Sequence, residues 1–157
     1  MWGILDMTLP RFKPKTLQSS QRAGPNEYRT VRPFVRILLV EDDLPVRNAI
    51  QHVLTNAQYR VVPAQTGEEA LKLIRQGYFD MVLTDVKLPG VDGVEVIRQA
   101  KQHNPRMPVL VVSGVPDPDM ETRALGAGAT FFLRKPLGAQ ELQTVVAGIL
   151  ERRGQIP

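Results

Sequence analysis

Short apolar runs alternate with segments of helical periodicity from residue 36 to the end of the chain. The clearest run is Ile37-Leu38-Leu39-Val40. A continuous apolar run of this length is typical of a strand buried on both faces of a sheet. We predict five such strands, over residues 36–40, 59–62, 80–84, 108–112 and 130–133.

The segments between these runs repeat their apolar residues at helical spacing. Three of them open with a helix-start signal: Asp43 before Pro45, Thr66 followed by Glu69, and Asp117 followed by Pro118. A short polar side chain caps a helix, a Glu three residues later completes a capping box, and Pro is tolerated in the first turn. We predict helices over residues 44–57, 67–75, 94–102, 118–127 and 142–150.

Strict alternation of strands and helices indicates an α/β fold. Right-handed βαβ units would give a doubly wound, parallel five-stranded sheet, (βα)5, with helices on both faces. In such sheets the functional crevice lies at the carboxyl ends of the strands. The residues that follow each strand are therefore the candidates for chemistry.

The composition agrees with one globular domain of 157 residues, with 43% hydrophobic and 23% charged residues. The absence of cysteine excludes disulfides, cysteine–metal sites and a cysteine nucleophile, and two histidines leave little room for a histidine-built zinc site. No apolar run approaches a membrane span, and we see no signal peptide. We expect a cytoplasmic protein without a membrane partner.

The net charge of +4 is concentrated at the N-terminus. Residues 1–36 contain seven Lys or Arg against Asp6 and Glu27, with four prolines between them. We predict that residues 1–34 form a mostly disordered basic extension, that 35–152 form the folded domain and that 153–157 are a tail. Nucleic acid is an expected partner only through this extension, which otherwise is a solvated segment or reflects a start at Met7.

Charged and hydroxyl side chains follow four of the five strands. Carboxylates follow the first and third strands, a serine follows the fourth and a lysine the fifth, and all of these should meet at one edge of the sheet. Carboxylates without nearby His or Cys suit a hard cation that prefers oxygen ligands, most plausibly Mg²⁺. The residues are Glu41, Asp42, Asp43, Asp85, Ser113 and Lys135.

Four motifs in this order resemble the receiver domain of two-component response regulators. They are Val-Glu-Asp-Asp at 40–43, Thr-Asp-Val-Lys-Leu-Pro-Gly-Val-Asp-Gly at 84–93, Val-Ser-Gly at 112–114 and Leu-Arg-Lys-Pro at 133–136. The resemblance covers about residues 35–152. It implies a flavodoxin-like strand order of 2-1-3-4-5.

The resemblance also implies a role for each motif residue. Asp85 would accept a phosphoryl group from a phosphohistidine. Lys135 would neutralise the phosphoryl oxygens, and Ser113 would hydrogen-bond one of them. Phe132 occupies the aromatic switch position, and the peptide bond before Pro136 would be cis.

The implied metal site uses the residues around the acceptor. Glu41, Asp42, Asp85 and the backbone carbonyl of Lys87 would bind Mg²⁺, for which Mn²⁺ could substitute. Glu41, Ser113 and Phe132 depart from the commoner Asp, Thr and Tyr at their positions. The first two departures keep the required chemistry, whereas Phe132 lacks a phenolic hydroxyl.

The implied partners are a histidine kinase or a histidine phosphotransfer protein, and a downstream protein that binds residues 117–151. The chain would be a signalling phospho-acceptor and not an enzyme. Alternatives are a pseudo-receiver that only binds proteins, or the receiver of a hybrid histidine kinase. An Asp-nucleophile phosphatase is disfavoured because Lys87 stands where a second aspartate is needed, and a flavin-binding protein because Glu41-Asp42-Asp43 would repel a phosphate.

Overall fold

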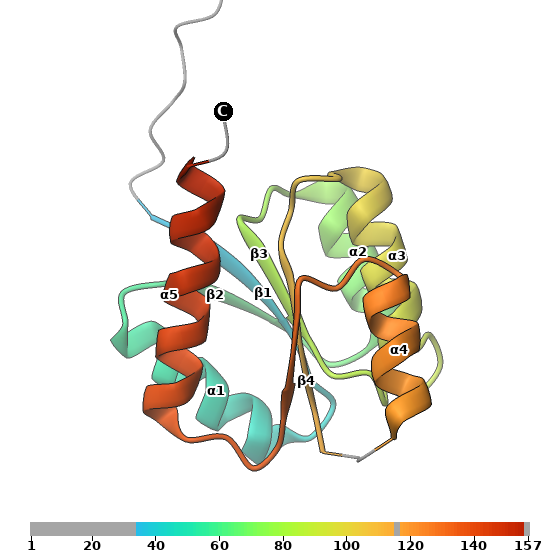
Figure 1. The fold of residues 1–157 in the computed structure, drawn as a ribbon, viewed down its shortest axis with the longest axis horizontal. Helices are drawn as coiled ribbons and strands as arrows, with labels where there is room; N and C mark the ends of the chain where they lie inside the picture. The colour runs from blue at the N-terminus through green and yellow to red at the C-terminus, as the bar shows by residue number, and fades with distance from the viewer. Residues whose placement is uncertain (1–33, 115–116, 156–157) are drawn as a thin grey trace, which may run out of the picture. The chain divides into compact units, whose positions relative to one another are not determined.

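The computed structural model describes residues 34–114 and 117–155, where five strands alternate with five helices (Figure 1). The predicted extension over residues 1–34 lies almost wholly outside the described residues. The elements are β1 (Arg36–Val40), α1 (Leu44–Asn56), β2 (Arg60–Ala64), α2 (Gly67–Gln76), β3 (Met81–Thr84), α3 (Gly93–His103), β4 (Val109–Ser113), α4 (Pro118–Gly126), β5 (Phe131–Arg134) and α5 (Ala139–Gln155).

The strands form one parallel sheet in the order β2-β1-β3-β4-β5. The predicted fold class and strand order are thereby confirmed. β1, β3 and β4 occupy the centre, and nearly all of their side chains are buried. Their apolar runs do not alternate with polar residues because helices cover both faces of the sheet.

Two apolar cores lie on the two faces of the sheet. Ile37 and Leu39 of β1 belong to the core beneath α1 and α5, whereas Leu38 and Val40 belong to the core beneath α2, α3 and α4. Figure 1 shows this division, with α1 and α5 on one side of the sheet and the other three helices opposite. The period-two geometry of a strand sends successive side chains into different cores.

The predicted helix starts are confirmed, with one difference in detail. Asp43 caps α1 by accepting from the Val46 amide, and Asp117 caps α4. Thr66 caps α2 by accepting from the Glu69 amide. The Glu69 carboxylate, however, accepts from the Gln65 amide instead of closing the box on Thr66 itself.

Two elements extend beyond their predicted ends by more than one residue. β2 continues through Pro63 to Ala64, with Pro63 paired in register with Leu39. Proline is compatible with this strand because β2 lies at the sheet edge, where one row of amides is not needed for the ladder. α5 continues to Gln155, past the predicted domain boundary at residue 152.

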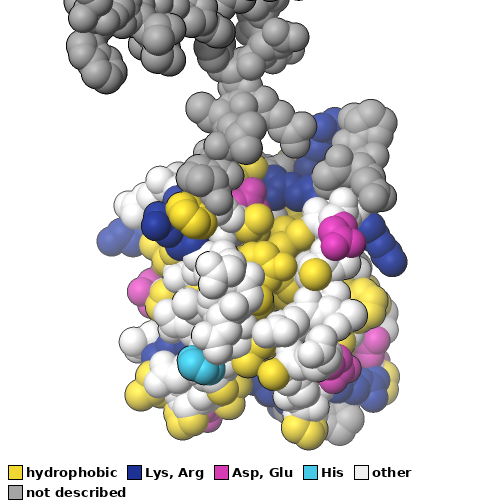
Figure 2. Space-filling model, turned by 90° about the vertical axis from the view of Figure 1, so that its left-hand side faces the viewer, with side chains coloured by type: hydrophobic (Ala, Val, Ile, Leu, Met, Phe, Trp, Pro, Cys, Tyr) yellow, Lys and Arg dark blue, Asp and Glu magenta, His cyan; other side chains and the backbone are white. Residues whose placement is uncertain are grey.

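The face formed by α1 and α5 shows a strip of hydrophobic side chains between more polar margins (Figure 2). Buried Leu142 and Val146 of α5 pack into the core beneath it together with Ile50 and Leu54 of α1. Within the described part of the chain, no helix is both long enough and apolar enough to cross a bilayer.

Candidate functional site

The sheet register brings the predicted site residues to one edge. Val40 pairs with Thr84, so Glu41 and Asp85 are the residues that directly follow paired positions on β1 and β3. On the other side of β3, Ser113 ends β4 and pairs with Arg134, which precedes Lys135. Residues from four separate segments therefore meet at the carboxyl ends of the strands.

Lys135 contacts the acidic residues that directly follow β1 and β3. Its Nζ lies 2.7 Å from Oε2 of Glu41 and 2.8 Å from Oδ2 of Asp85. Both carboxylates are buried, with Glu41 only 2% and Asp85 8% exposed. Their ammonium partner keeps its charge in contact with solvent at 21% side-chain exposure. The site thus holds two carboxylates and one cation at a partly open edge.

Burial and charge act in opposite directions on this group. Burial raises the pKa of Glu41, and its hydrogen bonds to Lys135 and to the Asp43 amide only partly offset that effect. For Lys135, burial alone would lower the pKa, but its hydrogen bonds to Asp85 and Glu41 outweigh burial and raise it. Lys135 therefore stays protonated at neutral pH and retains its charge for an anionic ligand.

Main-chain contacts fix the position of Asp85. Its amide donates to the carbonyl of Val40, and its Oδ1 accepts from the Lys87 amide at 3.0 Å. Gly93, at the start of α3, lies so close that a Cβ there would be 2.0 Å from the Asp85 carbonyl oxygen. The helix N-terminus consequently packs directly on the backbone of the residue that the sequence singled out.

The other two acidic residues after β1 have different positions. The Asp43 carboxylate is used as the α1 cap. Asp42 is exposed. Across residues 34–114 and 117–155, no cluster of three or more His, Cys, Asp or Glu side chains is close enough to hold a metal ion. Of the three expected carboxylate ligands, Glu41 and Asp85 contact the same side chain, that of Lys135. No such contact is seen for Asp42.

The chemistry of the available donors fits a hard cation. Glu41 and Asp85 supply buried carboxylate oxygens, Asp42 is the next residue along the chain, and no soft or nitrogen ligand is among them. Lys135 is the cationic partner of both buried carboxylates in this arrangement.

Ser113, Phe132 and Pro136 are the other side chains that the sequence assigned to the site. Ser113 is buried, and its carbonyl accepts from the Lys135 amide at 2.9 Å. Phe132 is half-buried against the core beneath α2, α3 and α4, whereas its neighbour Phe131 is 45% exposed. The peptide bond between Lys135 and Pro136 is cis.

Two contacts near the site were not predicted from the sequence. Arg47 of α1 is buried and donates to the main chain of Glu41. Glu68 of α2 accepts from the amide of Val91, in the loop that follows Asp85. Both side chains occupy ordinary helix positions, and the periodicity contains no signal that separates them from surface residues.

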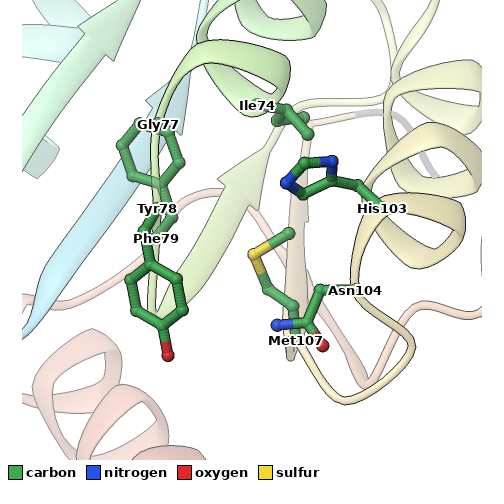
Figure 3. Close-up of a pocket in the computed structure, with 7 residues that line it drawn as sticks. All are labelled: Ile74, Gly77, Tyr78, Phe79, His103, Asn104 and Met107. Atoms are coloured by element: carbon green, nitrogen blue, oxygen red, sulfur yellow. The ribbon is translucent and has the colours of Figure 1, made fainter.

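A small hollow lies between the C-terminal ends of α2 and α3, away from these residues. It is lined by Ile74, Gly77, Tyr78, Phe79, His103, Asn104 and Met107 (Figure 3). None of the predicted site residues lines it.

Comparison with known proteins shows which family this chain resembles. The family model of the response regulator receiver domain matches residues 37–147. The transcriptional regulatory protein ZraR of Klebsiella oxytoca is 36% identical over 116 residues, which are 74% of this chain and 26% of that protein. The response regulator MprA of Mycolicibacterium vanbaalenii is 38% identical over 118 residues, 75% of this chain and 51% of that protein. The chain spans at most about half the length of these relatives.

Solved structures give the same result for the fold. A CheY-like response regulator receiver domain protein from Methanospirillum hungatei aligns with a TM-score of 0.76 and 29% identity, over 78% of this chain and 98% of that one. The chemotaxis protein CheY4 of Vibrio cholerae aligns with a TM-score of 0.70 and 26% identity, over 74% of this chain and 98% of that one.

Proposed function

The chain belongs to the response regulator receiver domain family, and from this premise we propose that Asp85 accepts a phosphoryl group from a phosphohistidine. The donor would be a histidine kinase or a histidine phosphotransfer protein. The modified domain would then change the surface that it offers to a downstream protein. In this role the chain is a phospho-acceptor and not a turnover enzyme.

The transfer is a displacement at phosphorus. An Oδ of Asp85 forms a bond to the phosphorus atom while the P–N bond of the phosphohistidine breaks. The electron pair of that bond stays on the imidazole nitrogen, which takes up a proton from solvent, and the product on Asp85 is a mixed anhydride. Negative charge is spread over the phosphoryl oxygens during this step, so the protein contributes mainly by positioning groups and stabilising charge.

The observation that carries the proposal is the contact of Lys135 with Asp85. Nζ lies 2.8 Å from Oδ2, and the raised pKa of Lys135 keeps the ammonium charged. A cation at this position would meet an oxygen of any phosphoryl group bound to Asp85. Ser113, buried at the end of β4, would donate its hydroxyl to another oxygen.

We further propose Mg²⁺ as the cofactor, with Mn²⁺ able to replace it. The carboxylates of Glu41, Asp42 and Asp85 and the backbone carbonyl of Lys87 would hold the ion, because these are oxygen donors of the kind that hard cations prefer. When bound, the ion would neutralise charge on the phosphoryl oxygens.

The proposed output surface comprises residues 117–151, which contain α4, β5 and most of α5. Leu125 of α4 and Phe131 of β5 are exposed on it, at 46% and 45%. Phe132, next to Phe131, would couple this surface to Ser113 by a shift between two pre-existing arrangements. A phosphohistidine donor of this class acts in the cytoplasm, which is the compartment we propose.

A pseudo-receiver that binds proteins without phosphorylation is the second candidate. It is favoured by the same ion pairs, because Lys135 gives both buried carboxylates a cationic partner within the protein itself. The two functions differ in whether Asp85 can be modified.

Intact-mass spectrometry distinguishes them. The chain and its Asp85→Asn variant are incubated with Mg²⁺ and a small acyl-phosphate donor, and a parallel sample contains a chelator. A single phosphoryl adduct that requires Mg²⁺ and is absent from the variant supports the proposed function. If neither the small donor nor a phosphorylated histidine kinase gives an adduct, the pseudo-receiver is correct.

A further inference from the structure

Arg47 is a buried arginine whose side-chain hydrogen bonds, among the described residues, are to the turn after β1. It belongs to α1 and is only 6% exposed. Its Nη1 donates to the carbonyl oxygen of Glu41 at 2.7 Å and lies 3.4 Å from that of Asp42. An arginine side chain does not lose its proton in a protein, so a permanent positive charge is buried beside this turn.

No carboxylate among the described residues forms an ion pair with this guanidinium. Burying a charge is unfavourable unless hydrogen bonds or opposite charges compensate it. The compensation for Arg47 comes from main-chain carbonyls of the segment that also carries the acidic side chains. Its placement is therefore tied to this turn and not to a partner elsewhere.

The Glu41 carbonyl is at the point where the sheet ladder ends. The amide of Glu41 still donates to Ala64 of β2 at 3.1 Å, which continues the ladder on that side. The carbonyl accepts instead from Arg47. With both main-chain groups held, the Glu41 side chain extends to Lys135 at 2.7 Å.

The backbone of Arg47 holds the other end of the same turn. Its amide donates to the Asp43 carbonyl at 2.8 Å and closes the first turn of α1, which Asp43 caps. The side chain and the amide of one residue thus contact all three residues of the acidic turn, defined here as residues 41–43.

From these contacts we infer that Arg47 is a positioning residue for cation binding. It holds the acidic turn so that the carboxylates of Glu41 and Asp42 are presented beside Asp85, and it touches neither the ion nor the phosphoryl group. The inference rests on the proposed function, whose cation it concerns. Outer-shell partners of this kind change metal affinity by about 10- to 100-fold when they are removed.

The test measures Mn²⁺ binding, which does not depend on phosphorylation. Electron paramagnetic resonance of the free ion gives the dissociation constant for the full chain and for Arg47→Met, Arg47→Lys and Arg75→Met. Met fills a similar volume without donor or charge, and Lys keeps one donor group. Arg75, exposed on α2, is the matched control. Circular dichroism at the same temperature establishes that each variant is folded.

We expect Arg47→Met to weaken Mn²⁺ binding by about 10- to 100-fold. Arg47→Lys should lie between Arg47→Met and the unmodified chain, because a lysine keeps the positive charge and N–H donors but lacks the planar guanidinium whose Nη1 reaches the Glu41 carbonyl. Arg75→Met should bind as the unmodified chain does. A purely structural role would lower thermal stability and leave the dissociation constant of the folded protein unchanged.

Unchanged Mn²⁺ affinity in folded Arg47→Met overturns the inference, as does the absence of Mn²⁺ binding by the unmodified chain. If Arg47→Met does not fold, weakened binding by folded Arg47→Lys supports the inference and unchanged binding overturns it. Failure of the proposed function has a different signature: Mn²⁺ binds and depends on Arg47, but no phosphoryl adduct forms on Asp85.

Discussion

Lys135 and Asp85 are 50 positions apart in the chain, and the Nζ of one lies 2.8 Å from Oδ2 of the other. The same Nζ contacts Glu41, which is 94 positions away. Four neighbouring strands, β1, β3, β4 and β5, must therefore be in register before this cation and these two anions can meet. The ion pairs consequently report on the assembled sheet as well as on the site.

Replacing Lys135 with methionine should destabilise the fold. The change leaves Glu41 and Asp85 buried without their ammonium partner, which we expect to cost about 1–3 kcal/mol, since an unpaired buried charge is unfavourable but this edge is partly open. The raised pKa of Lys135 means that its contribution is fully present below pH 10.5. Urea unfolding at pH 7 measures the loss, with Lys72→Met, an exposed lysine of α2, as the control.

Adding Glu41→Gln to Lys135→Met should recover part of that loss. The pKa of Glu41 is raised by its burial, so the carboxylate itself is costly once the lysine is gone. A neutral amide removes this cost. If the double variant is less stable than Lys135→Met, the electrostatic explanation of the Lys135–Glu41 pair is wrong. The Glu41 carboxylate would then not be the source of the cost in Lys135→Met.

The fold could be predicted because each central strand is a continuous apolar run. Ile37 to Val40 reads as a doubly buried strand, and the polar residues after such strands mark the edge where they meet. No comparable sequence pattern marks a side chain that contacts a residue from another part of the chain. Arg47 and Glu68 hold the loops around Asp85, yet their spacing is that of any helix residue. β2 was predicted too short because Pro63 is permitted only by its edge position.

Arg153 should stabilise the opposite end of the sheet more than its neighbour does. Its guanidinium donates to the Asp80 carbonyl at 2.6 Å, to the Asp80 carboxylate at 3.1 Å and to the Tyr78 hydroxyl at 2.7 Å. Arg153→Met should lower the free energy of unfolding by about 1–2 kcal/mol, because two partly buried hydrogen bonds and one exposed hydrogen bond are lost. Thermal or urea unfolding beside exposed Arg152→Met, expected within about 0.5 kcal/mol, tests this. If Arg153→Met and Arg152→Met change the free energy of unfolding equally, the hydrogen bonds of Arg153 contribute no net stability.

Gly93→Ala should disturb the site from the main chain. The added Cβ would lie 2.0 Å from the Asp85 carbonyl oxygen, a distance that requires α3 or the residue itself to move. We expect a loss of about 2 kcal/mol or more, as for an overpacked core, together with slower formation of the Asp85 adduct. Urea unfolding and intact-mass spectrometry measure the two effects.

Gly148→Ala is the matched control for that change. A Cβ at Gly148, inside α5, meets no atom within 4 Å outside its own helix. Alanine in a helix interior is more favourable than glycine by about 0.5–1 kcal/mol, so this variant should be more stable. Wild-type stability in Gly93→Ala would show that the start of α3 can shift without cost.

The half-buried phenol of Tyr59 should make stability depend on pH in the alkaline range. Burial raises the pKa of Tyr59 above its usual value of 10.0, and the nearby charge of Glu151 raises it further. Between pH 10 and this raised value, the folded chain keeps a proton that the unfolded chain has lost. Stability must therefore fall as the pH rises through that interval.

Tyr59→Phe removes the ionisable hydroxyl. Comparing the two proteins therefore separates the effect of Tyr59 from that of other groups that lose protons at alkaline pH. Urea unfolding of both proteins between pH 8 and pH 11 gives the difference in their free energies, which should be constant below about pH 10 and shift in favour of the phenylalanine variant above it. Glu151→Gln should reduce the slope, since the carboxylate supplies the second part of the pKa shift. A difference that stays constant through pH 11 would mean that the Tyr59 hydroxyl ionises as freely in the folded chain as in the unfolded one.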